Sequence, residues 1–135
     1  MGYTTISTQL KTILETIFGV GNVYEYAVKG VVPTPYAEIT MGPAESKPHT
    51  THANDESYNF MVRVYYPTTD SATCERIMRK AADDIFAAYR NNVTLNASCN
   101  FTGPLKCVPL FTTDTTPQLR VLEFSVEAKQ IINRT

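Results

Sequence analysis

Apolar side chains recur every three or four residues between Thr69 and Asn91, which is the strongest periodic signal in the chain. The repeat lasts for about five turns and matches the buried face of a helix. Charged residues fill most of the other positions, and Asp70 and Ser71 precede them as acceptors for the free amides of the first turn. The apolar positions are Cys74, Ile77, Met78, Ala81, Ala82, Ile85, Phe86 and Tyr89. A helix with one apolar side is unstable alone, so a sheet or other helices must cover it.

The first part of the chain predicts a shorter helix followed by two strands. Apolar residues again follow helical spacing from Thr5 to Phe18, and Gly19 ends this helix. Val23–Val28 and Pro35–Met41 alternate and are rich in β-branched and aromatic residues, with a proline-containing breaker between them. These two segments are therefore predicted to be strands.

Between Gly42 and Ser57 the composition becomes polar, with almost no large apolar side chain. Such a segment buries too little surface to offset the entropy lost on ordering, so we expect a long mobile loop. A loop of this length inside a compact domain is usually functional.

The remaining segments predict a strand before the long helix and a hairpin after it. Tyr58–Tyr66 alternates most clearly and ends at a proline. Apolar and polar residues alternate roughly in residues 94–111 and cleanly in Leu119–Ile131, and the turn-rich segment 112–118 lies between them. We therefore expect a C-terminal antiparallel hairpin over 94–131 whose outer part projects. The order predicts a single α+β domain over residues 1–135, with a mainly antiparallel sheet and two helices packed on one face.

Size and charge exclude several classes of partner. A chain of 135 residues is large enough for one domain with its own core. The net charge of −1 comes without any block of like charge, which argues against free nucleic acid or an anionic membrane as the main partner. No apolar run approaches the roughly 18 to 20 residues that cross a bilayer, and no basic segment followed by an apolar one opens the chain, so we expect an unsecreted protein. The odd number of cysteines, three, argues against a disulfide framework.

The predicted loop contains two histidines at a spacing that suits metal binding. His49 and His52 stand three residues apart, and Asp55 and Glu56 follow them. Two imidazoles at that spacing are able to reach one metal ion. The predicted loop offers no rigid scaffold to orient them, so we predict no metal ligand there.

Other reactive residues also have structural explanations. Asp83 and Asp84 are adjacent on the long helix, so their side chains diverge by about 100° and do not act as a pair. Glu123 and Glu127 lie on one face of a strand, a pattern typical of a solvated sheet surface. Cys74 falls on the apolar side of its helix, and no glycine-rich phosphate loop opens a helix. We therefore predict no catalytic residue and no cofactor.

The order of these segments resembles a known family over nearly the whole chain. The features that carry the likeness are Leu10, Ile13, Leu14 and Ile17 in the first helix, VYEY at Val23–Tyr26, PYAEI at Pro35–Ile39, FMVRV at Phe60–Val64, AADDIF at Ala81–Phe86 and the closing hairpin. In order and spacing they resemble the small tail terminator and tail completion proteins of long-tailed bacteriophages.

The resemblance implies a structural role in a virion. Members of this family form a ring of six copies on the last ring of the tail tube, stop its growth and offer a surface to the head-side connector. The expected partners are therefore other copies of the chain, the tail tube protein and the connector protein, with DNA present only by passage through the bore. The implied location is the head–tail junction of the virion, after assembly in the host cytoplasm.

Two segments are candidates for contacts that order on assembly, the predicted loop and the region around Gly103–Gln118. The candidate subunit or partner contacts in and near them are Glu45, His49, His52, Asp55, Glu56, Phe101, Leu105, Leu110 and Phe111. Glu45, Asp55 and Glu56 are also candidates for an acidic lining that keeps DNA from sticking to the bore.

Two alternatives remain open from the sequence. The nearer one is another phage structural component, a tail tube protein or a head–tail adaptor. The other is a small enzyme or ligand-binding module that uses the loop with His49 and His52 as a lid or metal site. Retention of one zinc ion per chain would favour the second alternative.

Overall fold

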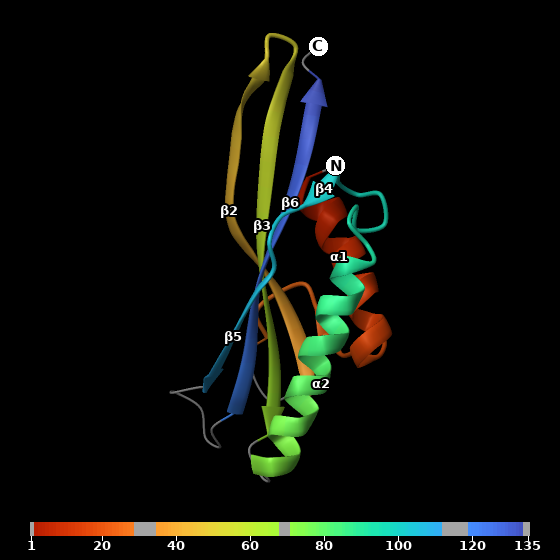
Figure 1. The fold of residues 1–135 in the computed structure, drawn as a ribbon, viewed down its shortest axis with the longest axis vertical. Helices are drawn as coiled ribbons and strands as arrows, with labels where there is room; N and C mark the ends of the chain where they lie inside the picture. Colours follow the sequence, from red (N-terminus) through yellow and green to blue (C-terminus); the bar gives the residue numbers. More distant parts are fainter. Residues whose placement is uncertain (1, 29–34, 68–70, 112–118, 134–135) are drawn as a thin grey trace.

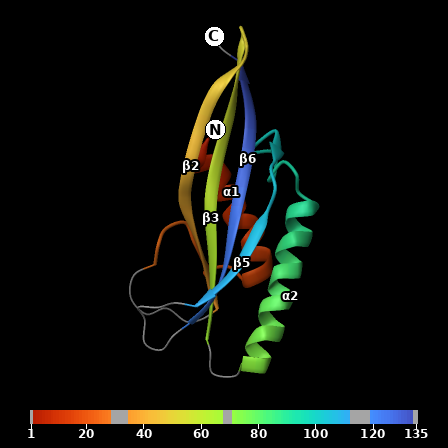
Figure 2. The ribbon, with the colours of Figure 1, turned by 60° about the vertical axis from the view of Figure 1, so that its left-hand side comes forward.

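The computed structural model describes residues 2–28, 35–67, 71–111 and 119–133 (Figure 1). The elements are α1 (Tyr3–Phe18), β1 (Val23–Tyr24), β2 (Tyr36–Thr50), β3 (Ala53–Pro67), α2 (Ser71–Arg90), β4 (Phe101–Thr102), β5 (Lys106–Phe111) and β6 (Leu119–Asn133). Both helices lie on one side of the sheet (Figures 1 and 2). The predicted α+β class is therefore confirmed. Neither of the two described helices is long and apolar enough to cross a membrane.

The sheet is built on three long neighbouring strands. Its order is β1-β2-β3-β6-β4, and β5 also pairs with β6. Figure 2 shows β2, β3, β6 and β5 side by side. All of these pairs are antiparallel except β1 with β2. The β3–β6 ladder runs without interruption from Ala53 opposite Asn133 to Pro67 opposite Leu119. The last described strand in sequence therefore lies near the middle of the sheet.

The core lies between the helices and the inner face of the sheet. β3 and β6 alternate as predicted, and every second residue of their central parts is buried against the helices. The helices contribute residues three or four positions apart. The main buried side chains are Ile6, Leu10, Ile13 and Leu14 of α1, Cys74, Met78, Ala81 and Ile85 of α2, Phe60, Val62 and Val64 of β3, and Leu122, Phe124, Val126 and Ala128 of β6.

The predicted mobile loop at Gly42–Ser57 is wrong. These residues extend β2 and β3 as a hairpin whose turn is at Thr51 and His52, and β6 pairs with the β3 side of it. Strand pairing satisfies the backbone N–H and C=O groups of this segment without any apolar burial. The polar composition of the segment alone does not reveal that such pairing occurs. This hairpin projects beyond the ends of both helices (Figure 1), whereas the predicted outer end of the C-terminal hairpin, residues 112–118, lies outside the described residues.

The other differences are smaller. The strand predicted at Val23–Val28 covers only Val23 and Tyr24. Ile77 is 49% exposed because it lies about 100° around α2 from Met78, beside the stripe that packs on the core. In the C-terminal hairpin, β5 pairs with β6 as predicted, whereas residues 94–100 form turns. The predicted link 112–118 and the capping side chains of Asp70 and Ser71 lie outside the described part of the structure.

Candidate assembly surfaces

The long strands run past the ends of both helices and form a projecting blade, which we define as residues 42–57 of β2 and β3 together with residues 127–133 of β6 (Figures 1 and 2). Neither helix covers its far end. Residues 43–48 on its β2 side are all exposed. The blade is therefore a polar, extended surface held mainly by strand pairing.

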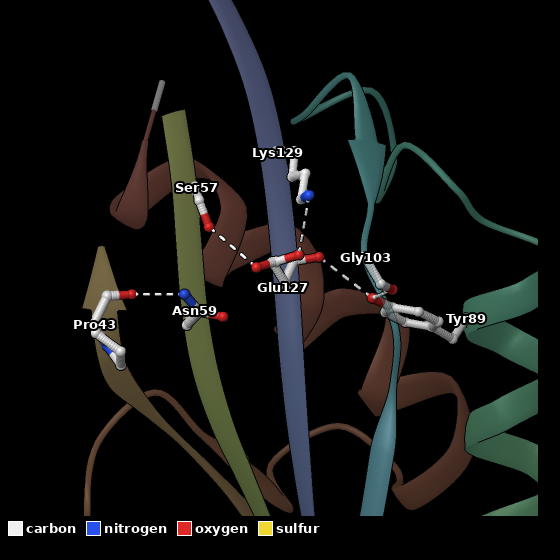
Figure 3. Close-up of polar contacts among 7 residues, drawn as sticks. All are labelled: Pro43, Ser57, Asn59, Tyr89, Gly103, Glu127 and Lys129. Carbon is white, nitrogen blue, oxygen red and sulfur yellow. Dashed lines mark hydrogen bonds and ion pairs between the residues drawn. The ribbon is translucent and has the colours of Figure 1, made fainter. Parts of the chain in front are cut away.

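Glu127 fixes the root of the blade on the β6 side (Figure 3). Ser57 Oγ donates to Glu127 Oε2 at 3.3 Å, and Lys129 Nζ lies 3.5 Å from Oε1. Gly103 N donates to the Glu127 carbonyl at 2.9 Å, while the hydroxyl of Tyr89 on α2 donates to the Gly103 carbonyl at 2.7 Å. A Cβ atom at Gly103 would overlap Glu127 Oε1. A side chain at position 103 would therefore have to displace the Glu127 carboxylate, and the hydrogen bond from Tyr89 ties α2 to the blade.

A second set of contacts fixes the root on the β2 side. Asn59 Nδ2 donates to the Pro43 carbonyl at 2.9 Å (Figure 3), and the hydroxyl of Tyr3 on α1 donates to the Gly42 carbonyl at 2.8 Å. These contacts lie at a bulge in β2, where its pairing with β3 shifts by one residue. Both helices therefore contribute a tyrosine hydroxyl to the base of the blade.

The blade carries a hollow of about 300 Å³. It is lined by Glu45, Lys47, Asp55, Glu56, Ser57, Phe101, Glu127, Lys129, Gln130 and Ile131. Its lining contains four carboxylates and two ammonium groups, so it is acidic overall. The structure thus brings together Glu45, Asp55, Glu56 and Phe101 from the contacts predicted from sequence.

Tyr58 connects this surface to the first helix. Its hydroxyl donates to Glu56 Oε1 at 2.8 Å, and its ring packs edge-on against Tyr3, with 5.1 Å between centroids. Burial, followed by the hydrogen bond to Glu56, raises the pKa of Tyr58 to about 12. The phenol therefore stays protonated and holds the Glu56 carboxylate in place.

The other predicted contact residues lie in different places. His52 is exposed in the turn at the tip of the blade, and the side chain of His49 lies outside the described part of the structure. Leu110 and Phe111 are 39% and 53% exposed on β5. Leu105 packs against the core. The structure therefore separates the predicted contacts into two surfaces, one on the blade and one on β5.

The contact that positions Phe111 was not predicted from the sequence. The Arg120 guanidinium carbon lies 4.5 Å from the centroid of the Phe111 ring, and Arg120 Nη1 lies 2.6 Å from Glu75 Oε1 on α2. The cation–π contact holds an exposed aromatic ring at the edge of the sheet. No local spacing signals this group, because its members come from three separate elements.

A second missed group lies on the sheet face away from the helices. Glu38 is only 4% exposed, and its carboxylate accepts hydrogen bonds from the Tyr65 hydroxyl at 2.7 Å and from Val28 N at 2.9 Å. The Tyr65 ring stacks on Tyr36 with 4.8 Å between centroids. Burial and the hydrogen bond to Glu38 raise the pKa of Tyr65. The group ties the backbone of Val28 to β2. The only sequence signal was a glutamate within an otherwise apolar strand.

The described residues offer little reactive chemistry. Among them, no group of three or more histidine, cysteine, aspartate or glutamate side chains could hold a metal ion. Cys74 and Cys99 are buried, and Cys107 is partly buried. Burial raises the pKa of the Cys99 and Cys107 thiols, which disfavours the nucleophilic thiolate.

Comparison with known proteins finds a similar fold in the solved structure of a virion. No protein-family model and no curated protein matches the chain. A chain in a solved structure described as the virion of a native gene transfer agent (GTA) particle is similar, with a TM-score of 0.50 and 17% sequence identity. The match covers 95% of this chain and 91% of that chain. The two chains therefore share their fold over nearly their whole lengths.

Proposed function

We propose that this protein is a structural component of a phage-like virion. The observation that carries the proposal is the fold shared with a chain of the GTA virion, which extends over 95% of the sequence. The absence of a metal-binding group among the described residues and the raised pKa values of Cys99 and Cys107 fit a protein that acts through its surfaces. We accordingly propose no catalytic role and no cofactor.

Within the virion, the proposed role is that of a tail terminator. Six copies close into a ring on the end of the tail tube, stop its polymerisation and present a joining surface to the head-side connector. The order of sequence features supports this role by its resemblance to the tail terminator family. Ring closure needs two different surfaces on each copy, and the two opposite edges of the sheet, at β2 and at β5, provide candidates for them.

The blade is the proposed contact with other virion proteins. It projects beyond the helices, and its hollow combines a polar rim with exposed Phe101 and Ile131. Partner surfaces commonly combine apolar contact area with such a rim. The carboxylates of Glu45, Asp55 and Glu56 would repel phosphate wherever this surface faces the bore.

The test is the oligomeric state of the purified protein, measured alone and after mixing with tail tubes from the same particle. We expect rings in negative-stain images, with a mass six times the 15.1 kDa of one chain. Adding the protein to polymerising tube subunits should shorten the tubes and place a ring at one end. Long tubes formed by the protein alone would identify it as a tube protein instead. A monomer that never binds tubes or connectors would overturn the proposal.

A further inference from the structure

We propose that the open edge of β2 in one copy pairs with β5 of a neighbouring copy, so that the sheet continues from subunit to subunit. This inference rests on the proposed function, because it specifies the contact that closes the ring. The occupant of the β2 edge is thus a second copy of this chain.

The edge of β2 is open beyond its short pairing with β1. β1 lies opposite only Ala37 and Glu38, and no described strand lies beside β2 on that side from Ile39 onward. Ala37 N donates toward β1, to the Asn22 carbonyl at 2.9 Å. Backbone groups of every second residue point to the same side of a strand, so those of Ile39 and Met41 face the open edge. Such an edge is a template for another strand.

A hollow lies directly beside this edge, between β2 and α1. Its volume is about 240 Å³, and its lining includes the apolar side chains of Ile39, Met41 and Phe60. Ser7 and Thr8 of α1 contribute hydroxyl groups to the opposite wall. Met41 is 70% exposed at this edge and is free to contact an added strand. A strand added here would place its helix-side residues in this hollow.

β5 supplies a matching strand on the opposite side of the sheet. Val108, Leu110 and Phe111 are all exposed on it, and an exposed apolar edge strand tends to pair with another chain. Pro109 in the same strand has no backbone N–H, so the contact forms with one ladder hydrogen bond fewer and depends more on its side chains. Arg120 holds the Phe111 ring on the helix side of the sheet, the side on which the hollow lies. Each copy therefore has one edge with an apolar hollow and another with an aromatic residue that can fill it.

The strand directions make this contact antiparallel. β5 is antiparallel to β6, β6 to β3, and β3 to β2, so β5 and β2 run in opposite directions within one sheet. Antiparallel pairing follows when the neighbouring copy keeps the same orientation along the strands, as copies around a ring axis do.

One register fits the side chains on both faces. It places Phe111 opposite Ile39, Leu110 opposite Thr40 and, beyond the bulge in β2, Lys106 opposite Glu45. In this register Phe111 and Ile39 both lie on the helix side. The last residue of β5 is then opposite the first β2 residue beyond the pairing with β1. Lys106 and Glu45 both lie on the other face and are both exposed, so they form an ion pair.

Disulfide trapping tests this register directly. In the variant Thr40→Cys/Leu110→Cys the new thiols face each other across the proposed contact, and oxidation should give a ladder of covalent multimers that a reductant removes. The matched control, Thr40→Cys/Ile77→Cys, moves the second thiol to an exposed position on α2 and should stay largely uncoupled. Cys74 and Cys99 are buried and should not contribute, and both variants also carry Cys107→Ser because Cys107 lies on β5 and is only partly buried.

A charge exchange gives a second and independent test. Either Glu45→Lys or Lys106→Glu alone should raise the protein concentration needed for half-maximal ring formation by roughly threefold to fivefold, because like charges then face each other. The double exchange should restore most of the loss. Circular dichroism of each variant checks that the fold is intact.

The outcomes separate this inference from the proposed function. Two results would overturn the edge contact but not the proposed ring. One is rings that form without disulfide coupling between residues 40 and 110. The other is a double exchange that needs as high a protein concentration for ring formation as the single changes. A wild-type protein that never associates, alone or on tail tubes, would overturn both.

Discussion

Arg120 Nη1 lies 2.6 Å from Glu75 Oε1, so that one guanidinium joins α2 to β6. The same group lies 4.5 Å from the centroid of the Phe111 ring on β5. The Arg120 side chain is only 13% exposed, whereas that of Glu75 is 38% exposed. The pair therefore stabilises the edge of the sheet by packing as well as by charge.

Replacing Arg120 should cost more stability than replacing Glu75. Arg120→Ala removes the ion pair, the cation–π contact and buried packing, so we expect a loss of about 1–3 kcal/mol in the free energy of unfolding. Glu75→Gln should cost less than about 1 kcal/mol because water reaches that carboxylate. Urea denaturation measures both. Arg79→Gln, which changes an exposed partner 3.8 Å from Glu75, is the control and should have almost no effect.

Gly103→Ala should destabilise the root of the blade. The new methyl group would push the Glu127 carboxylate away from Ser57 and Lys129, and losing these partly exposed contacts should cost roughly 1 kcal/mol. Combining it with Glu127→Ala should recover part of the loss, since the obstructing carboxylate is then absent. Thermal unfolding of the two single variants and the double variant measures this coupling. Strictly additive effects would contradict the contact.

Alkaline pH should weaken the folded state through Tyr58. Its pKa is about 12 in the folded protein against the 10.0 of an ordinary tyrosine, so the unfolded phenol loses its proton first as the pH rises. The stability from this group is therefore complete below pH 10 and is lost between pH 10 and about 12. Urea denaturation at pH 9 and pH 11 measures the change. Tyr58→Phe should show a smaller decrease, and an equal decrease would exclude Tyr58 as a cause.

Removing the blade should abolish binding to tail tubes without unfolding the domain. The variant replaces residues 45–57 by an Asn-Gly turn between Ala44 and Tyr58, which lie opposite each other in the β2–β3 ladder. The buried core lies mainly outside the deleted segment, so a cooperative unfolding transition should remain. The matched control, Thr51→Asn/His52→Gly, keeps the full blade and should still bind tubes. Tube binding by the truncated variant would show that the blade is not needed for this contact.

Much of the fold was predictable because its core follows local periodicity. The buried residues of α1, β3 and β6 recur at the spacing of their elements. The blade was not predictable, because Ser57 is ordered by pairing with Lys129, which lies far away in the sequence. Local composition carries no information about such a partner, and polar residues in a solvated strand resemble those of a loop.

The candidate site was only partly predictable for a related reason. Glu45, Asp55 and Glu56 were identified from the change in composition, and the structure places them around one hollow. The junction of Tyr89, Gly103 and Glu127 depends on three elements meeting in space. No spacing rule links these residues, so only the fold brings them together.

The central position of β6 also governs when the chain is able to fold during synthesis. β3, β4 and β5 all pair with this strand, yet it is the last of the described strands to leave the ribosome. Until residues 119–133 emerge, the β2–β3 hairpin lacks its neighbour and the inner face of β3 is incompletely covered. Contacts between such distant segments form slowly, and the waiting hairpin is open to aggregation. The polar hydroxyl and amide side chains along residues 45–57 keep that nascent hairpin soluble.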